Sequence, residues 1–312
     1  MTSDSRVSWA ALLLRRLGGA AGTLLGVTLV TFLVVYRLPG DPAALLAGPR
    51  ADPEVIANIR RELKLDQPLP LQYADYLVRL AHLDLGQSYV RREPVAEVIR
   101  RRLPQTLQLA LAGWLCWLLF GTALGTWVAA RPGRWREGAL LGFSILGVST
   151  PTFWVGLLLL YLFVTRWKLL PAGGSGTLRH LLLPLLALSF AGVAYYARVA
   201  HTTVRDALAQ DYVRTARAKG LSFGSVVCRH ALRNALLPLV TLAGADLAAL
   251  LGGVVFTESV FDWKGMGQLA VESVALVDLP MILGVVLVSA IFVVLANLIV
   301  DLLYPLLDPR IR

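Results

Sequence analysis

The chain has 312 residues, of which 56% are hydrophobic and only 16% are charged. Soluble domains carry about 25% charged residues, so this composition excludes an ordinary soluble protein and predicts one membrane domain. The net charge of +10 does not indicate a nucleic-acid partner, because the basic residues lie between apolar segments, where the positive-inside rule and anionic lipid account for them. The two cysteines, Cys116 and Cys228, provide neither a disulfide framework nor a metal-ligand spacing.

Six apolar segments are predicted to cross the membrane, since a bilayer core requires about 20 apolar residues in a helix. They are Leu17–Tyr36, Leu103–Ala130, Gly138–Thr165, Leu181–Ala197, Ala235–Thr257 and Leu279–Val300. The fourth segment is short but can extend through His180, and the fifth is interrupted by Asp246. The first segment is too long for a signal peptide and is predicted to be retained. The sequence thus predicts an all-α membrane protein with both termini on one side.

Basic residues in short loops predict the orientation. The loops 131–137 and 201–234 are predicted to be cytoplasmic, together with both termini, because they are rich in Lys and Arg. These residues are Arg131, Arg134, Arg136, Arg205, Arg214, Arg217, Lys219, Arg229 and Arg233. The loop 258–278 has Lys264 as its only base. One feature disagrees with this orientation. Arg100, Arg101 and Arg102 would lie on the extracytoplasmic side, directly before the second span.

The long segment 38–102 is predicted to be an extracytoplasmic helical insertion. Apolar residues recur at helical spacing in Pro53–Lys64 and Pro70–His82, with prolines between the two stretches. The predicted organisation is an N-terminal tail with the first membrane helix (1–37), the insertion (38–102), a core of five membrane helices (103–304) and a cytoplasmic tail (305–312).

Small residues four apart occur in three of the predicted spans, where they allow helices to approach closely. They are Gly18, Gly22 and Gly26, then Gly121 and Gly125, then Gly138 and Gly142. Packing within the bundle and a homodimer interface both explain this spacing.

Sequence signatures of catalysis are absent. None of the four lysines is followed by Ser or Thr, so the chain has no GxxxxGK[ST] phosphate-binding loop, and the four histidines are too scattered for a metal site. The clearest intramembrane charge is Asp246. An Asp at the centre of a membrane helix costs about 2.5–3.5 kcal/mol on insertion scales, so Asp246 is expected to face the bundle interior or an aqueous path. It could line a translocation path with Gly252 and Gly253, form a structural pair, or couple transport to protons.

The basic segment between the fourth and fifth spans has the pattern of two short helices. Ala207–Lys219 has an amphipathic pattern, and Gly220 stands where a glycine often ends a helix. Ser222 is a suitable N-cap for a second helix running toward Asn234. An ordinary positive-inside loop would explain the arginines but not this order, so the segment 207–238 is predicted to be a rigid docking element.

This segment resembles the EAA loop of permease subunits in binding-protein-dependent ABC importers, in particular the first permease of the dipeptide/oligopeptide/nickel group. The resemblance covers nearly the whole chain through motifs in the expected order. These motifs are LPGDP (Leu38–Pro42), DLGQS (Asp84–Ser88), the PV–LPQT stretch (Pro94–Thr106), STPTFWVGLLL (Ser149–Leu159), HALRNALLP (His230–Pro238), GGVVFTESVF (Gly252–Phe261) and NLIVDLLYPLLDPRIR (Asn297–Arg312).

The resemblance implies a six-span bundle in the bacterial inner membrane that pairs with a homologous second permease. Two cytoplasmic ATPase subunits, which bind ATP and Mg²⁺, and an extracytoplasmic solute-binding protein would complete the importer, while this chain would hold no cofactor. The implied ATPase-coupling residues are Arg214, Ala216, Arg217, Ala218, Lys219, Gly220, Leu221, His230, Arg233 and Asn234.

Three positions depart from related patterns. Arg214 replaces the Glu of the general loop motif, as it does in the peptide group, while Lys264 replaces a Pro and Val277 replaces an Arg near the expected binding-protein side. The cargo stays open among dipeptides, longer peptides, nickel, haem and glutathione. The alternatives are a self-contained secondary carrier or channel, for which only Asp246 supplies a coupling-ion site, and a membrane scaffold, for which no signalling domain is present.

Overall fold

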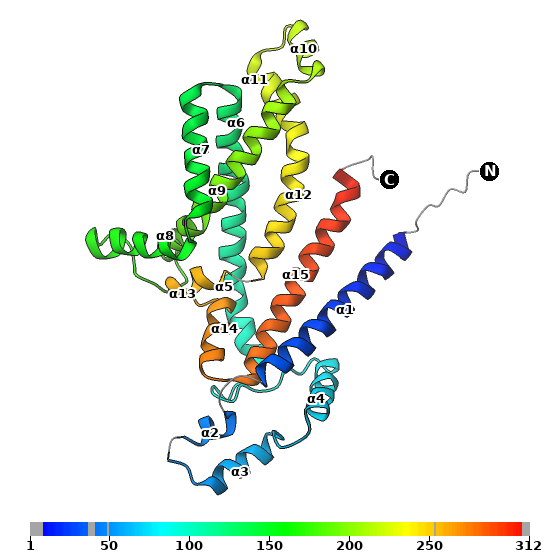
Figure 1. The fold of residues 1–312 in the computed structure, drawn as a ribbon, viewed down its shortest axis with the longest axis vertical. Helices are drawn as coiled ribbons and strands as arrows, with labels where there is room; N and C mark the ends of the chain where they lie inside the picture. Colours follow the sequence, from blue (N-terminus) through cyan, green and yellow to red (C-terminus); the bar gives the residue numbers. More distant parts are fainter. Residues whose placement is uncertain (1–8, 37–40, 49, 253, 308–312) are drawn as a thin grey trace, which may run out of the picture. The chain divides into compact units, whose positions relative to one another are not determined.

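The computed structural model describes residues 9–36, 41–48, 50–252 and 254–307 (Figure 1). Within these ranges the regular structure is helical, with a single isolated bridge between Gln87 and Pro94. This confirms the all-α prediction. The chain divides into two compact units: residues 1–104 with 269–294, and residues 105–268 with 295–312.

The first unit contains the first predicted membrane helix and the segment predicted as an insertion. Its elements are α1 (Trp9–Val35), α2 (Pro42–Ala47), α3 (Pro53–Glu62), α4 (Leu69–Ala81), the beginning of α5 (Val95–Cys116), most of α14 (Met266–Ala275) and the beginning of α15 (Leu279–Leu307). The helices α3 and α4 fall on the two stretches predicted from apolar spacing. The Asp41 side chain caps α2 by accepting a hydrogen bond from the Ala43 N–H at 3.0 Å.

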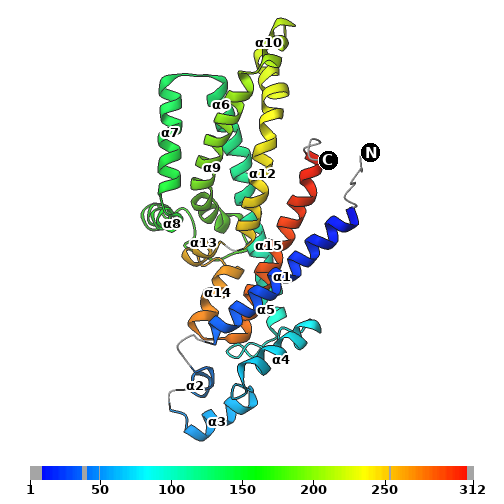
Figure 2. The same cartoon turned by 45° about the vertical axis from the view of Figure 1, so that its right-hand side comes forward.

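An aromatic cluster joins α1, α4 and α15 inside the first unit. Phe32, Tyr76 and Leu283 are buried together, and Tyr73 packs against them. The Thr28 hydroxyl of α1 lies 3.1 Å from the Tyr73 hydroxyl of α4, and both views of the ribbon place α4 near the C-terminal end of α1 (Figures 1 and 2). These contacts fix α4 against the C-terminal part of α1.

The second unit is a helical bundle around α9. Its further elements are π-helical Trp117–Gly121, α6 (Thr122–Ala130), α7 (Arg134–Ser149), α8 (Thr152–Leu159), π-helical Leu160–Arg166, α9 (Leu178–Leu208), α10 (Asp211–Ala218), α11 (Phe223–Ser225), π-helical Val226–Ala231, α12 (Leu232–Leu251) and α13 (Val255–Val260). The long helix α9 packs against α6, α7, α8 and α12.

Four helical stretches are individually long and apolar enough to cross a membrane: Arg15–Val35, Val95–Ala130, Leu178–Leu208 and Leu279–Ile299. Two further helix pairs pass the same test together but are bent, by 98° between Arg134–Ser149 and Thr152–Arg166 and by 50° between Phe223–Leu236 and Pro238–Leu251. The described residues thus hold four candidate spans, or up to six if each bent pair is one span.

Two predicted spans were wrong as uninterrupted helices. The stretch Gly138–Thr165 divides into α7 and α8, because Pro151 has no N–H to continue the helical hydrogen bonds and disfavours helical geometry in the residue before it. The stretch Ala235–Thr257 also divides, since α12 ends at Leu251 and α13 begins at Val255. The predicted span Leu181–Ala197 is instead longer, as part of α9.

Glycines allow α6 and α9 to meet backbone to backbone. A Cβ atom on Gly125 would lie 2.2 Å from the Ala197 carbonyl oxygen, and one on Gly121 would lie 2.4 Å from the Tyr196 Cβ. Packing within the bundle therefore explains this pair of glycines. The glycines of α1 and α7 differ: among the described residues, no atom outside their own helix lies within 4 Å of a Cβ built on Gly18, Gly22, Gly26, Gly138 or Gly142.

Candidate functional site

The basic segment after α9 forms a compact helical hairpin. The helix α9 ends at Leu208, and α10 begins at Asp211 after the extended residue Gln210. The prediction of one helix over 207–219 was therefore wrong at its start. The amphipathic pattern continued across a chain reversal at Ala209 and Gln210, which periodicity alone does not reveal.

The end of α10 was predicted correctly. Gly220 has a φ angle of +80°, a left-handed conformation that glycine adopts without a Cβ penalty. Its N–H donates to the Arg217 carbonyl at 2.9 Å, and the Leu221 N–H donates to the Ala216 carbonyl at 3.3 Å. This hydrogen-bond pattern is the Schellman motif, and it fixes the direction in which the chain leaves α10.

The hairpin has its own small apolar core. Val213 and Ala216 of α10 are buried against Val226, and Leu208 packs on them. Ala216 is only 6% exposed, so this predicted coupling residue stabilises the hairpin and does not present its side chain to a partner. Sequence reasoning could not place Ala216, because its neighbour Val226 belongs to the next helical segment.

The outer surface of α10 is both basic and apolar. The exposed predicted coupling residues are Arg214, Arg217, Ala218, Lys219, Gly220, Leu221, Arg233 and Asn234, while His230 is half-buried. Two exposed aromatic residues, Tyr212 and Phe223, lie beside them and had not been assigned to the site. The Arg217 guanidinium lies 5.0 Å from the centre of the Phe223 ring, a cation–π contact. We call Tyr212, Arg217, Leu221 and Phe223 the α10 surface.

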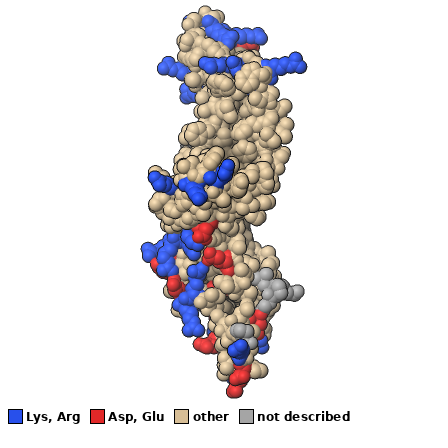
Figure 3. Space-filling model, turned by 90° about the vertical axis from the view of Figure 1, so that its left-hand side faces the viewer, with Lys and Arg blue, Asp and Glu red and all other residues tan. Residues whose placement is uncertain are grey.

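Charge around the α10 surface is predominantly basic. Lys and Arg gather at the end that carries α10, and a wide region with few charged side chains follows (Figure 3). Asp211 and Glu137 pair here with Arg214 at 3.5 Å and Arg205 at 3.1 Å. Aromatic and Arg side chains are enriched at protein interfaces, and positive potential favours a partner with acidic residues. The α10 surface therefore has the chemistry of a protein-docking site.

Asp246 lies on α12 with a hydrogen-bond partner. The buried Tyr196 of α9 donates its hydroxyl proton to Asp246 Oδ2 at 2.7 Å. The Asp246 carboxylate is half-buried, so it keeps access to its surroundings while one oxygen is bound. Gly252 takes the C-cap position of α12, and Gly253 lies outside the described residues.

A buried carboxylate that sequence reasoning missed holds α13 against α5. Glu258 is fully buried and accepts hydrogen bonds from the Thr106 hydroxyl at 2.6 Å and the Gln268 N–H at 2.9 Å. The Thr106 oxygen in turn accepts from the Met266 N–H at 2.7 Å. A Cβ on Gly265 would lie 2.2 Å from Glu258 Oε1, so only glycine fits there. We call Glu258, Thr106 and their backbone donors the Glu258 network.

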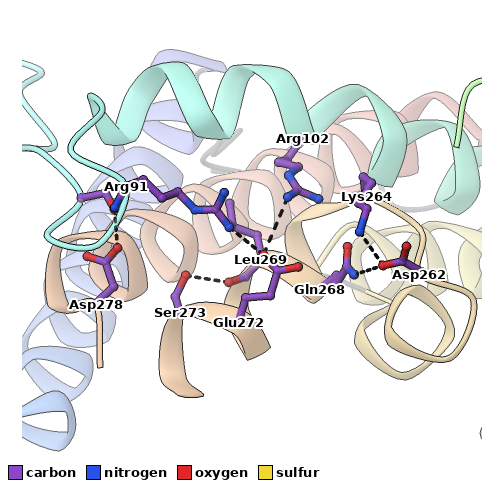
Figure 4. A network of polar contacts seen from close by, with 10 residues as sticks. Arg91, Arg102, Asp262, Lys264, Gln268, Leu269, Glu272, Ser273 and Asp278 are labelled. Carbon is purple, nitrogen blue, oxygen red and sulfur yellow. Dashed lines mark hydrogen bonds and ion pairs between the residues drawn. The ribbon is translucent and has the colours of Figure 1, made fainter. Parts of the chain in front are cut away.

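The segment after α13 contains Lys264, one of the three departures from related sequence patterns. Trp263 is buried, and its indole N–H donates to the Gln105 carbonyl at 2.9 Å. Lys264 pairs with Asp262, which also accepts a hydrogen bond of 2.6 Å from the Gln268 side chain (Figure 4). Lys264 therefore takes part in a surface network with Asp262 and Gln268. A proline at this position would instead restrict the backbone.

In the first unit, acidic residues at and after α14 bind the Asp84–Glu93 loop and α5. Asp278 is buried and accepts hydrogen bonds from the Ser88 hydroxyl and, at 3.0 Å, the Tyr89 N–H. Burial raises the pKa of Tyr89. Glu272 pairs with Arg91 at 2.7 Å and with Arg102 at 3.7 Å (Figure 4).

The Arg100–Arg102 run that disagreed with the predicted orientation is locally compensated. Arg102 pairs with Glu272, Arg101 with Glu93, and Arg100 with Glu97 at 3.0 Å. Within the described residues, no group of three or more His, Cys, Asp and Glu side chains is placed to hold a metal ion.

Comparisons with known proteins cover nearly the whole chain. Residues 121–312 match the family described as "Binding-protein-dependent transport system inner membrane component", and residues 10–110 match the family of its N-terminal part. The glutathione transport system permease protein GsiC of Salmonella typhi is 42% identical over 299 residues, covering 96% of this chain and 98% of that protein. GsiC of Escherichia coli is 41% identical with the same coverage.

A solved structure shares the fold. The MetNI methionine ABC transporter, in an inward-facing conformation, has a chain that matches with a TM-score of 0.54 and 17% sequence identity, covering 68% of this chain and 97% of that chain. At this identity the likeness concerns the fold alone, and the family matches carry the assignment. This chain therefore belongs to the family of binding-protein-dependent transport system inner membrane components.

Proposed function

We propose that this chain is the permease subunit of an ATP-driven importer for glutathione or similarly small peptides. The observation that carries the proposal is the 42% identity to a glutathione permease over 96% of the chain. The exposed α10 surface adds to it, because a permease without a nucleotide site of its own needs a surface through which an ATPase can act.

The proposed assembly contains a homologous second permease, two cytoplasmic ATPase subunits and an extracytoplasmic solute-binding protein, in a bacterial inner membrane. ATP and Mg²⁺ bind to the ATPase subunits. Both termini and α10 lie in the cytoplasm, and the insertion at 38–102 lies outside, followed by the membrane core at 103–304 and the C-terminal tail at 305–312. The basic loops 131–137 and 201–234 support this orientation.

Coupling in this proposal depends on the rigidity of the hairpin. The buried contact of Val213 and Ala216 with Val226 joins α10 to the helical stretch that leads into α12. A displacement of α10 by a closing ATPase therefore moves α12 as well. Movement of a rigid element is one of the known ways in which a local change reaches a distant site. Its driving force here is the difference in ATPase binding between two states of the bundle.

The proposed translocation path includes Asp246 together with Gly252 and Gly253 near the end of α12. The hydrogen bond from Tyr196 to Asp246 supports a position facing the interior, because a lipid-facing carboxylate would be costly. In this role Asp246 is a hydrogen-bonding side chain of the path wall, and no proton coupling is required.

The test is ATP-dependent glutathione uptake by the complete importer in proteoliposomes with Leu221→Asp. Leu221 is 41% exposed, so the change leaves the hairpin core intact while placing a charge on the α10 surface. Loss of an apolar interface contact costs about 1–2 kcal/mol, so we expect uptake to fall by about five- to thirtyfold.

The matched control is Leu83→Asp, at a residue that is 87% exposed outside the hairpin. This variant should transport normally. Undiminished uptake in Leu221→Asp would contradict the proposed coupling surface. Concentrative uptake by this chain without ATPase subunits, driven by an ion gradient, would instead favour a secondary carrier.

A further inference from the structure

A cavity in the first unit has no role in the proposed transport mechanism. It has a volume of about 270 Å³, close to the lower limit of about 300 Å³ for small-molecule sites. Its wall is formed by Phe32 at the C-terminal end of α1 and Tyr36 just after it, by α4, and by the beginning of α15 at Leu283. The cavity thus lies where two membrane-spanning helices meet the insertion.

The helix α4 beside this cavity has the pattern of a helix at the membrane surface. Its inner face buries Gln72 and Tyr76, whereas Leu71 and Val78 on its outer side are 57% and 59% exposed. Leu71 and Val78 are seven residues apart and share one face. An amphipathic helix with exposed apolar residues is suited to the boundary between lipid headgroups and acyl chains.

The adjacent membrane helix supports the same location. Leu33 and Val34 of α1 are 47% and 56% exposed, next to the aromatic residues that line the cavity. Tyrosines are enriched at the level of the lipid headgroups because their rings are amphipathic. The cavity is therefore expected at the level of the lipid headgroups, on whichever side of the membrane the first unit lies.

Charged residues in the wall are balanced in sign. Lys64 and Arg79 supply two positive charges, and Glu62 and Asp75 supply two negative ones. The Asp75 carboxylate lies 3.7 Å from the Lys64 ammonium and 3.9 Å from the Arg79 guanidinium. Both distances exceed the range of a hydrogen bond, so Asp75 leaves these N–H groups able to bind another acceptor.

One further polar group in the wall is unsatisfied. The Tyr76 hydroxyl is buried and has no hydrogen-bond partner among the described residues. Leaving a buried hydroxyl without a partner costs about 1–3 kcal/mol. Burial also raises the pKa of Tyr76 to about 12, so the phenol stays neutral and keeps its donor proton.

We propose that this cavity binds the headgroup of a zwitterionic phospholipid that carries a primary ammonium, namely phosphatidylethanolamine. Lys64 and Arg79 bind the phosphate, and Glu62 and Asp75 accept hydrogen bonds from the ammonium. The acyl chains leave along the exposed apolar side chains of α1 and α4. A choline headgroup has no N–H to donate, and a glycerol headgroup has no positive charge, so neither satisfies both halves of the wall.

The experiment measures lipids retained by the complete importer. The complex is reconstituted in vesicles with equal amounts of phosphatidylethanolamine, phosphatidylcholine and phosphatidylglycerol, extracted in mild detergent, and analysed by native mass spectrometry. We expect the wild-type permease to retain phosphatidylethanolamine at least about fivefold more than either other lipid. In Arg79→Gln this retention should fall at least about fivefold, and in Glu62→Gln the preference should shift toward phosphatidylglycerol.

The control is Arg61→Gln, an exposed position on α3 that does not line the cavity; its lipid retention should match the wild type. Equal retention of the three lipids by the wild type would overturn the proposal, as would unchanged retention in Arg79→Gln. Loss of the bound lipid on addition of glutathione, with glutathione retained in its place, would also overturn it and identify a cargo site. Lipid retention is measured without ATP and does not require transport. A negative result would therefore contradict the lipid proposal without bearing on the transport proposal.

Discussion

Replacing Glu258 by Gln tests whether its buried carboxylate holds α13 and α5 together. The two side chains have nearly the same shape, so the change alters hydrogen bonding and charge while preserving volume. The carboxylate accepts hydrogen bonds on both oxygens, from the Thr106 hydroxyl on one and from the Gln268 N–H on the other. An amide has a single acceptor oxygen, so one of these donors must then face an NH₂ group.

The expected cost follows from these two contacts. A hydrogen bond to a charged group contributes about 1.5–3 kcal/mol, and a buried donor left without an acceptor costs about 1–3 kcal/mol. Glu258→Gln should therefore destabilise the protein by about 2–4 kcal/mol, since one bond is weakened and the other lost. For a domain of roughly 150–250 residues, a loss of about 1 kcal/mol in the free energy of unfolding lowers the melting temperature by about 2–4 °C. The melting temperature should therefore fall by roughly 5–15 °C.

A second variant shows whether Thr106 and Glu258 act as one network. Thr106→Val removes the hydroxyl that donates to Glu258 and accepts from the Met266 N–H. Substitutions within one hydrogen-bond network do not have additive effects on stability. The double variant should therefore lose less stability than the sum of the losses in the two single variants. The coupling should be about 1–2 kcal/mol.

The assay is thermal unfolding of the purified importer, followed by fluorescence, with Glu54→Gln as the control. Glu54 is an exposed glutamate on α3, and its replacement should leave the melting temperature within about 1 °C, as for surface substitutions in general. The reasoning would be refuted if Glu258→Gln had the same melting temperature as the wild type. It would also be refuted if the stability losses of Glu258→Gln and Thr106→Val were strictly additive in the double variant.

Four further variants have defined outcomes. Gly125→Ala should lower the melting temperature strongly, because its Cβ would lie 2.2 Å from a carbonyl oxygen of α9. Its control is Gly142→Ala, where no atom of the described residues outside the helix itself lies within 4 Å of the Cβ, and which should be neutral or stabilising in the same melting assay. Gly220→Ala should cost about 1 kcal/mol through its positive φ and reduce uptake measured in proteoliposomes. Tyr196→Phe should lower glutathione uptake by removing the hydrogen bond to Asp246, with assembly of the complex measured alongside as the control; equal uptake would contradict a path role for this pair.

Local sequence signals predicted local structure well. Gly220 ended α10 as expected because the left-handed conformation depends on that residue and its immediate neighbours. The helices α3 and α4 followed from apolar spacing and flanking prolines. The break in the third predicted span was also local in cause, since Pro151 stood in the sequence, but hydropathy alone favoured an uninterrupted helix.

Residues that depend on distant partners could not be placed in this way. The burial of Ala216 requires Val226, and the buried position of Glu258 requires Thr106, which is 152 residues away in the chain. A glutamate in a polar loop between two spans is indistinguishable by composition from an exposed one. The α10 surface was predicted only in part for the same reason, because the exposure of Phe223 depends on how the hairpin folds.

The helical stretch from Phe223 to Leu251 carries both the edge of the α10 surface and Asp246 on one continuous backbone. At 1.5 Å per residue, the chain between Phe223 and Asp246 spans about 35 Å, apart from shortening by the bend of 50° near Pro238. Movement between these two sites is therefore transmitted through the helix backbone itself and does not depend on side-chain contacts. Its transmission requires that the helical stretch be stiff. The bend is therefore the point where a substitution would let one end move while the other stayed still.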